Sequence, residues 1–170
     1  MDKALTTILL VIASLVTAVM VMNAVYPAIS QSSSSLSSIS TRMVDRMKSQ
    51  TAIVHATGEL DQDGVWQDTN SDGEFDLFIW IKNVGTNKII NIENSDIFLG
   101  GQGSWTRILH EDWAGGALPS WDYTIENGNE WIQANTIMIE ISSNSTLQSG
   151  EYQIKIIIPN GVSDEYYFSM

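Results

Sequence analysis

Residues 4–22 read ALTTILLVIASLVTAVMVM, an apolar run without a charged residue, a glycine or a proline. As an α-helix this run would be about 28 Å long, close to the thickness of the hydrocarbon core of a bilayer. Apolar side chains would cover every face of the helix, whereas a surface helix of a small soluble domain has only one such face. We therefore expect lipid or other copies of the helix to surround it, in contact with Leu5, Ile8, Leu9, Ile12, Leu15, Val16, Val19 and Val21.

A removable signal peptide is the alternative interpretation of this segment. The run is longer than an ordinary signal-peptide core, and the only basic residue before it, Lys3, follows an aspartate. No small-x-small cleavage pattern closes the run before polar sequence begins. The sequence therefore favours a retained helix that is stored in a membrane.

After the apolar run the helical pattern is interrupted once and then resumes. Pro27 lacks an amide donor, so we expect a kink at residues 23–26 rather than an end of the helix. Apolar side chains then recur at helical spacing among serines, at Leu36, Ile39, Met43, Val44 and Met47. We expect one helix to about residue 50, and a flexible linker at residues 32–38 is the alternative.

From residue 51 onward the apolar pattern changes to a period of two, which is typical of strands. Glycine and asparagine turn signals separate seven candidate strands, at residues 51–60, 74–83, 88–99, 104–109, 135–142, 151–159 and 165–170. This number of short strands is typical of an immunoglobulin-like sandwich. The predicted fold class is therefore α+β: a long N-terminal hydrophobic helix (residues 1–50), kinked near Pro27, followed by an antiparallel immunoglobulin-like β-sandwich (residues 51–170).

Composition excludes several classes of function. The 20 acidic against 8 basic residues give a net charge of −12, which disfavours nucleic acid as a partner. The absence of cysteine excludes disulfides and thiolate metal sites. No nucleophile-elbow, phosphate-loop or zinc-protease motif is present. Of the two histidines, we expect a structural role for His55 and a solvated loop for His110, although Glu111 and Asp112 beside it are possible metal ligands. We expect no enzyme.

One loop has the ligand spacing of a calcium site. Asp68, Asn70, Asp72 and Asp76, with a glycine after the third, match positions one, three, five and nine of a calcium loop. Position twelve, where a glutamate would complete the loop, is Ile79, so an isolated EF-hand is not expected. A looser Ca²⁺ site completed by neighbouring oxygens is one hypothesis, and a simple hairpin loop is the other.

Two further features bear on sugars. Asn144 begins the sequon Asn-Ser-Thr in a polar turn, which is a reachable place for a glycan on an exported protein. Trp105, Trp113 and Trp121 flank glycine-rich loops. They could stack on sugars, but we expect them to lie in the core or in contacts between subunits.

Four segments together resemble the archaellin family of type IV pilin-like filament subunits and their minor relatives. They are the helix ALTTILLVIASLVTAVMVMNAVY, the strand and turn FIWIKNVGTNKI, the segment SDIFLGG and the closing SGEYQIKIIIPNGVSDEYYF. The resemblance implies helices bundled into a filament core, assembly from a membrane pool and a β domain on the extracellular surface. It also implies a prepilin-type peptidase and the archaellum motor platform as partners.

The sequence departs from this pattern at its start, where Met-Asp-Lys leads straight into the apolar run instead of a basic leader. Bacterial pilins carry a glutamate at the fifth position of the mature helix, and Leu5 stands here, so the archaellin branch fits better. We expect a homo-oligomeric filament subunit for motility or adhesion. The alternatives are a membrane-anchored minor component that binds the cell envelope and anchors the motor, and a lone anchored receptor for carbohydrate or calcium.

Overall fold

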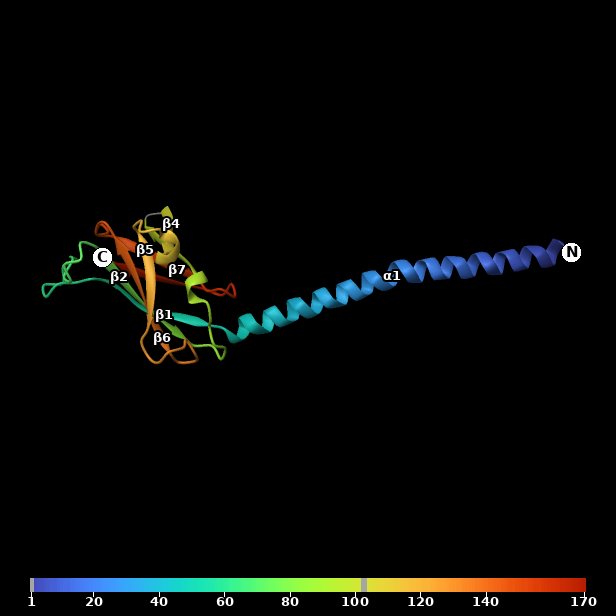
Figure 1. The fold of residues 1–170 in the computed structure, drawn as a ribbon, viewed down its shortest axis with the longest axis horizontal. Coiled ribbons are helices and arrows are strands. Elements are labelled where there is room, and N and C mark those ends of the chain that lie inside the picture. Colours follow the sequence, from blue (N-terminus) through green and yellow to red (C-terminus); the bar gives the residue numbers. More distant parts are fainter. Residues whose placement is uncertain (1, 102–103) are drawn as a thin grey trace. The chain divides into compact units, whose positions relative to one another are not determined.

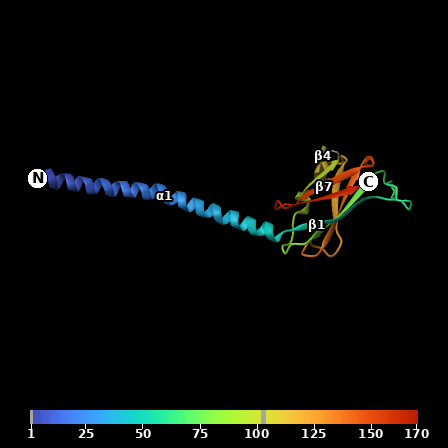
Figure 2. The ribbon, with the colours of Figure 1, turned by 180° about the vertical axis from the view of Figure 1, so that it is seen from behind.

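The computed structural model describes residues 2–101 and 104–170, which divide into two compact units at residues 44 and 45. Helix α1 runs from Asp2 to Lys48 and continues through Pro27 without a break. Both views show it bending gently in its middle rather than stopping (Figures 1 and 2). The continuous helix is therefore confirmed, and the alternative of a flexible linker at residues 32–38 is wrong.

Serine and threonine are poor helix formers, and the helix accommodates them by local hydrogen bonds. Thr7 and Thr17 donate to the carbonyls of Lys3 and Ala13, at 2.9 and 2.7 Å. Farther along, Ser35 donates to the carbonyl of Gln31 at 2.9 Å. These hydroxyls are therefore bonded within the helix and do not compete with its backbone hydrogen bonds.

The described residues of the second unit form eight strands: β1 (Thr51–Gly58), β2 (Phe75–Asn83), β3 (Asp96–Gly101), β4 (Ser104–His110), β5 (Ser120–Ile125), β6 (Thr136–Ser143), β7 (Glu151–Ile157) and β8 (Ser163–Ser169). They form one sheet in the order β1-β2-β6-β5-β4-β3-β7-β8. Two short helices interrupt them, a 3-10 helix at Ile92–Asn94 and α2 at Glu111–Ala114.

The sheet curls so that its two edge strands approach each other. The amide of Ile53 on β1 donates to Asp164 Oδ2 on β8 at 2.6 Å, and the result is a nearly closed, sandwich-like barrel (Figure 1). All pairings are antiparallel except the short one between β4 and β5. The predicted fold class is confirmed, with this parallel pair as a difference in detail.

The core of the second unit is rich in isoleucine. Ile79, Ile137 and Ile139 have no exposed surface, and the indoles of Trp121 and Trp131 are almost completely buried. Every described residue that is buried lies after residue 44. The hydrophobic core of residues 45–170, which we call the β domain, is therefore complete without the apolar helix.

Candidate functional site: the apolar helix and its junction with the β domain

The described side chains of α1 up to residue 48 are all exposed. The eight apolar residues that the sequence assigns to packing are among them, and each exposes about half of its surface or more. Exposed apolar surface costs about 25 cal/mol per Å² in water, so a free helix of this kind is strongly unfavourable. The helix requires either lipid or a protein partner.

The apolar surface of α1 extends well beyond one bilayer thickness. About 20 apolar residues suffice to cross the hydrocarbon, whereas α1 has 47 residues. At a period of 3.6 residues, Val25, Ile29, Leu36 and Met43 fall on one side of its second half, and all four are exposed. A bilayer is thick enough to cover only about half of such a helix. The stripe on the second half would lie outside the bilayer and is uncovered in the single chain.

The carboxyl end of α1 is held by the turn that follows β2. The carbonyl of Lys48 accepts hydrogen bonds from the amides of Thr86 and Asn87, at 2.7 and 3.1 Å. The carbonyl of Gln50 accepts two more, from the amides of Val84 and Gly85, both at 2.9 Å. Helix ends leave carbonyls without intrahelical partners, and this turn supplies the missing donors.

Glycine is required at position 85 because the backbones approach so closely there. A Cβ atom at this position would lie 2.3 Å from the Lys48 carbonyl oxygen and 2.5 Å from the amide nitrogen of Gln50. Both neighbours are backbone atoms, which cannot rotate away. The Lys-Asn-Val-Gly motif therefore fits this junction only because its last residue is a glycine.

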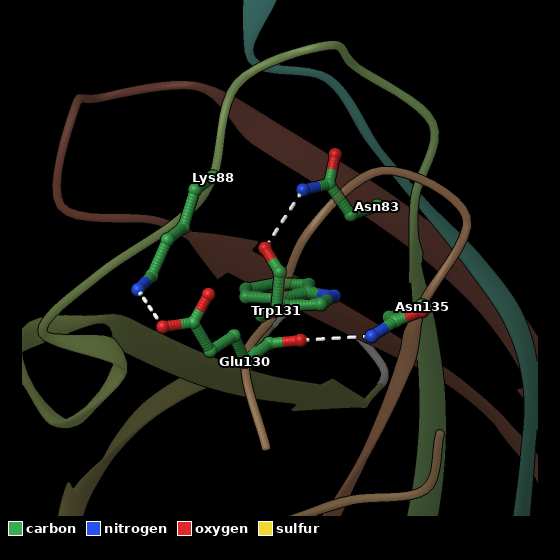
Figure 3. A network of polar contacts seen from close by, with 5 residues as sticks. All are labelled: Asn83, Lys88, Glu130, Trp131 and Asn135. Carbon is green, nitrogen blue, oxygen red and sulfur yellow. Dashed lines mark hydrogen bonds and ion pairs between the residues drawn. The ribbon is translucent and has the colours of Figure 1, made fainter. Parts of the chain in front are cut away.

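The asparagine of the same motif, Asn83, is completely buried and supports the turn from inside. Its Nδ2 donates to the carbonyls of Asn87 and Trp131 at 2.9 and 3.0 Å, and its Oδ1 accepts from the amide of Gly85 at 3.0 Å. Figure 3 shows this contact with Trp131 beside the bonds of Glu130 to Lys88 and Asn135. Asn83 thus joins the turn after β2 to the loop before β6.

A second turn contacts the helix end from another side. Arg46 Nε donates to the carbonyl of Asn160 at 3.2 Å, in the Pro-Asn-Gly-Val turn between β7 and β8. The two turns that carry the resemblance to archaellins therefore meet at the same helix end. We call residues 46–50, 83–87 and 160–161 the helix junction. The sequence predicts both segments as turns, but nothing in it indicates that they contact the same helix end.

The predicted calcium residues are arranged as a series of turns. Asp68 accepts from the amides of Ser71 and Gly73, at 2.5 and 2.9 Å, while Asn70 and Asp72 each accept from the amide two residues later. Asp76 is buried on β2, and its Oδ2 accepts a hydrogen bond from Asn70 Nδ2 at 3.5 Å. Within residues 2–101 and 104–170 no three histidine or acidic side chains are gathered as a metal group. The structure places these oxygens on local amides, and calcium binding stays a prediction.

Asp76 instead lies beside Glu140 on β6, with a hydrogen bond between the two carboxyl groups. Burial, together with the charges of Asp72 and Glu59, raises the pKa of Asp76. Burial and the neighbouring charge of Asp76 raise the pKa of Glu140 from 4.5 to about 7. Two adjacent carboxylates cannot easily ionise together, so the pair holds a proton near neutral pH.

This pair predicts that acidification stabilises the β domain. A carboxyl group with a raised pKa in the folded state contributes most below its unfolded pKa, and the contribution is lost as the pH rises through about 7. We expect the free energy of unfolding to fall by roughly 1–2 kcal/mol more in the wild type than in Glu140→Gln between about pH 5 and pH 8. Chemical denaturation of both proteins at the two pH values measures this difference in the free energy of unfolding. Equal changes with pH in the two proteins would contradict the prediction.

The remaining candidate residues have mostly structural environments. The expected solvated loop for His110 is wrong: the residue ends β4, is 5% exposed, and its ring meets Trp121 edge-on at 4.5 Å. His55 lies exposed on β1 and stacks on Trp80. Asn144 is exposed in the turn between β6 and β7, where a glycan would be accessible. Of the three tryptophans, Trp121 lies in the core as expected, whereas Trp105 and Trp113 are exposed.

The family model of the archaeal-type flagellin matches residues 3–168, nearly the whole chain. The chain belongs to this family. Archaeal-type flagellins are structural components of the archaellum and not enzymes, and a long apolar helix followed by a β domain is the fold expected of one. The comparison with curated proteins found no match.

Three solved structures are similar to this archaeal-type flagellin. The archaellum periplasmic stator protein FlaG of Sulfolobus acidocaldarius is 25% identical, with a TM-score of 0.54, over 71% of this chain and 99% of FlaG. A structure of the FlaF–FlaG stator complex from that organism is 26% identical, with a TM-score of 0.52, over 70% of this chain and 88% of the matched chain. The flagellin FlaB1 of Methanocaldococcus jannaschii is 14% identical, with a TM-score of 0.53, over 72% and 90% of the two chains, which shows a common fold.

Proposed function

We propose that this flagellin is a subunit of an extracellular helical filament in which the α1 helices of many copies pack together. The observation that carries the proposal is the apolar stripe on the second half of α1, which lies beyond the reach of a bilayer. Copies of the same helix are a partner that can cover both halves at once. A homo-oligomer held in this way needs no other protein to be stable.

Assembly then follows from the change of surroundings of the helix. In a membrane the residues around 4–22 are covered by lipid, so single subunits can be stored there before assembly. Once extracted, the helix is stabilised only by neighbouring copies, and a head-to-tail contact that does not close produces a helical filament. The acidic β domain would form the outer surface. A prepilin-type peptidase and the archaellum motor platform are the partners that this route requires.

An accessory role at the base of the archaellum is the second candidate function. The identity to the stator protein FlaG is 25%, and the match covers 99% of FlaG, whereas the identity to FlaB1 is 14%. In this role α1 anchors the chain in the membrane and the β domain contacts the cell envelope. This candidate leaves the stripe on the second half of α1 without a stated partner.

Shearing filaments from cells and analysing them by electron microscopy and mass spectrometry distinguishes the two functions. The filament proposal predicts that this chain is the dominant protein of the purified filaments. An accessory protein would stay with the cell body at low copy number. Purified filaments that lack the chain would contradict the proposal.

We also propose Ca²⁺ as a ligand of the loop that contains Asp68, Asn70 and Asp72, with Asp76 as the residue of the pattern nearest the core. Saturating calcium should raise the melting temperature, since about a hundredfold excess over Kd adds about 2.7 kcal/mol of stability. The Asp68→Ala variant should show no such rise. Equal shifts in wild type and Asp68→Ala would remove this site.

A further inference from the structure

Four residues form a row across the outer face of the sheet, one on each of strands β4, β3, β7 and β8. Gly100 pairs with Trp105 on one side and with Gln153 on the other, and Gln153 pairs with Tyr167. Residues directly opposite each other share a face of the sheet. Ile154, the neighbour of Gln153, points into the core, so this row points outward. Trp105 is 47% exposed and Tyr167 is 70% exposed.

The two glycines at the end of β3 shape the space beside this row. A Cβ atom on Gly100 would lie 2.9 Å from the indole of Trp105, so the ring lies directly over the glycine. On the other face the ring of Tyr152 lies in the same way over Gly101, 2.7 Å from the position of its missing Cβ. Beside the indole lies a groove whose lining includes Gly100, Trp105 and Gln153.

This groove has a volume of about 400 Å³, within the usual range for small-molecule sites. We call it the aromatic groove, and its lining includes Gly100, Ser104, Trp105, Glu151, Gln153 and Tyr167. The side-chain amide of Gln153 is oriented by Glu165, because its Nε2 donates to Glu165 Oε2 at 2.9 Å. Aromatic rings with a few oriented polar groups between them are typical of ligand sites.

The charge of the lining restricts the class of ligand. Glu151 lines the groove, and no basic side chain lines it among the residues that the structure describes. Nearby, the charge of Lys155 is paired with Glu165 at 2.5 Å. Anionic ligands would be repelled, whereas hydroxyl groups can donate to the carboxylate of Glu151 and to the amide oxygen of Gln153.

We propose that the aromatic groove binds a neutral oligosaccharide. The apolar face of a sugar ring packs on an exposed aromatic ring such as Trp105 or Tyr167, while its hydroxyls reach the polar groups between them. Strands β4 and β8 are three strand spacings apart, about 14 Å, so the row spans two to three sugar rings. The site does not depend on whether the chain builds the filament or serves as an accessory protein.

Isothermal titration calorimetry on residues 45–170, which contain the complete core, tests this proposal. The probes are cellohexaose and mannohexaose as neutral ligands and hexagalacturonic acid as an anionic one. We expect at least one neutral hexasaccharide to bind and the anionic one not to bind. Trp105→Ala should weaken binding at least about tenfold, since it removes one stacking ring.

Trp113→Ala is the matched control, because Trp113 is 52% exposed on α2, outside the groove. It should bind as the wild type does. Tyr167→Phe should also keep the affinity, whereas Tyr167→Ala should reduce it. Failure of both neutral sugars to bind, or equal losses in Trp105→Ala and Trp113→Ala, would overturn the proposal. The proposal would also be overturned if no sugar bound and sedimentation velocity showed self-association that Trp105→Ala abolishes. That result would assign this face to contact with a second copy.

Discussion

Replacing Leu36 by aspartate will abolish filament growth and leave both membrane storage and the β domain intact. Leu36 is exposed in the single chain and lies on the apolar stripe beyond residues 4–22. In a bundle of helices the new carboxylate would be buried without a partner, at a cost of several kcal/mol in every subunit. Electron microscopy of cells that carry only the variant measures filament number and length.

The matched control is Ser38→Asp, which introduces the same side chain two residues later on the opposite side of the helix. It should still give filaments. Membrane fractionation should find both variants in the membrane, because the apolar run that lipid covers is unchanged. Normal filaments from Leu36→Asp would contradict packing through this stripe and would favour the accessory role.

Gly85→Ala will destabilise the helix junction. Among the described glycines without a positive φ, we expect this Gly→Ala substitution to have the largest effect there. The new Cβ would lie 2.3 Å from the carbonyl oxygen of Lys48, closer than real Cβ contacts, so the two backbone segments must separate. The hydrogen bonds to Lys48 and Gln50 would then weaken together. We expect a loss of about 2–4 kcal/mol in the free energy of unfolding of residues 45–170.

Gly150→Ala provides the control for this variant. The nearest atom to a Cβ at position 150 is 3.9 Å away, on the ring of Tyr152, so the methyl group has room. Its effect should be within about 1 kcal/mol of the wild type. Urea denaturation of both variants measures the difference, and limited proteolysis near residues 48–50 shows whether the junction has opened. Equal stabilities would contradict a required close approach at Gly85.

The sequence determines the helix and most strands because their patterns are local. The length of the apolar run and the spacing of Leu36, Ile39 and Met43 predict a continuous helix, and it ends at Lys48, two residues before the expected end. The sequence pattern does not reveal strand β5, because its six residues lie among glycine and proline turns and only one of its side chains, Trp121, is fully buried. The candidate strand at residues 88–99 is too long, since a 3-10 helix occupies Ile92–Asn94 and strand β3 begins only at Asp96.

The site depends on contacts between distant residues, which periodicity does not reveal. Nothing in the local pattern indicates that the Lys48 carbonyl meets the amides of residues 86 and 87, or that Asp76 and Glu140 share a face on neighbouring strands. The groove beside Trp105 likewise depends on a strand register that only the folded sheet defines. The spacing of acidic residues in the loop did predict tight turns, as Asp68 shows.

The helix junction also has a mechanical consequence. A tensile force along the helix reaches the β domain at Lys48 and Gln50. There, several main-chain hydrogen bonds to the turn after β2 share this force. That turn continues from a strand with partners on both sides, so the load enters the interior of the sheet instead of peeling away edge strand β1 first. Tension on the helix would therefore be resisted by several main-chain bonds together before any edge strand separates.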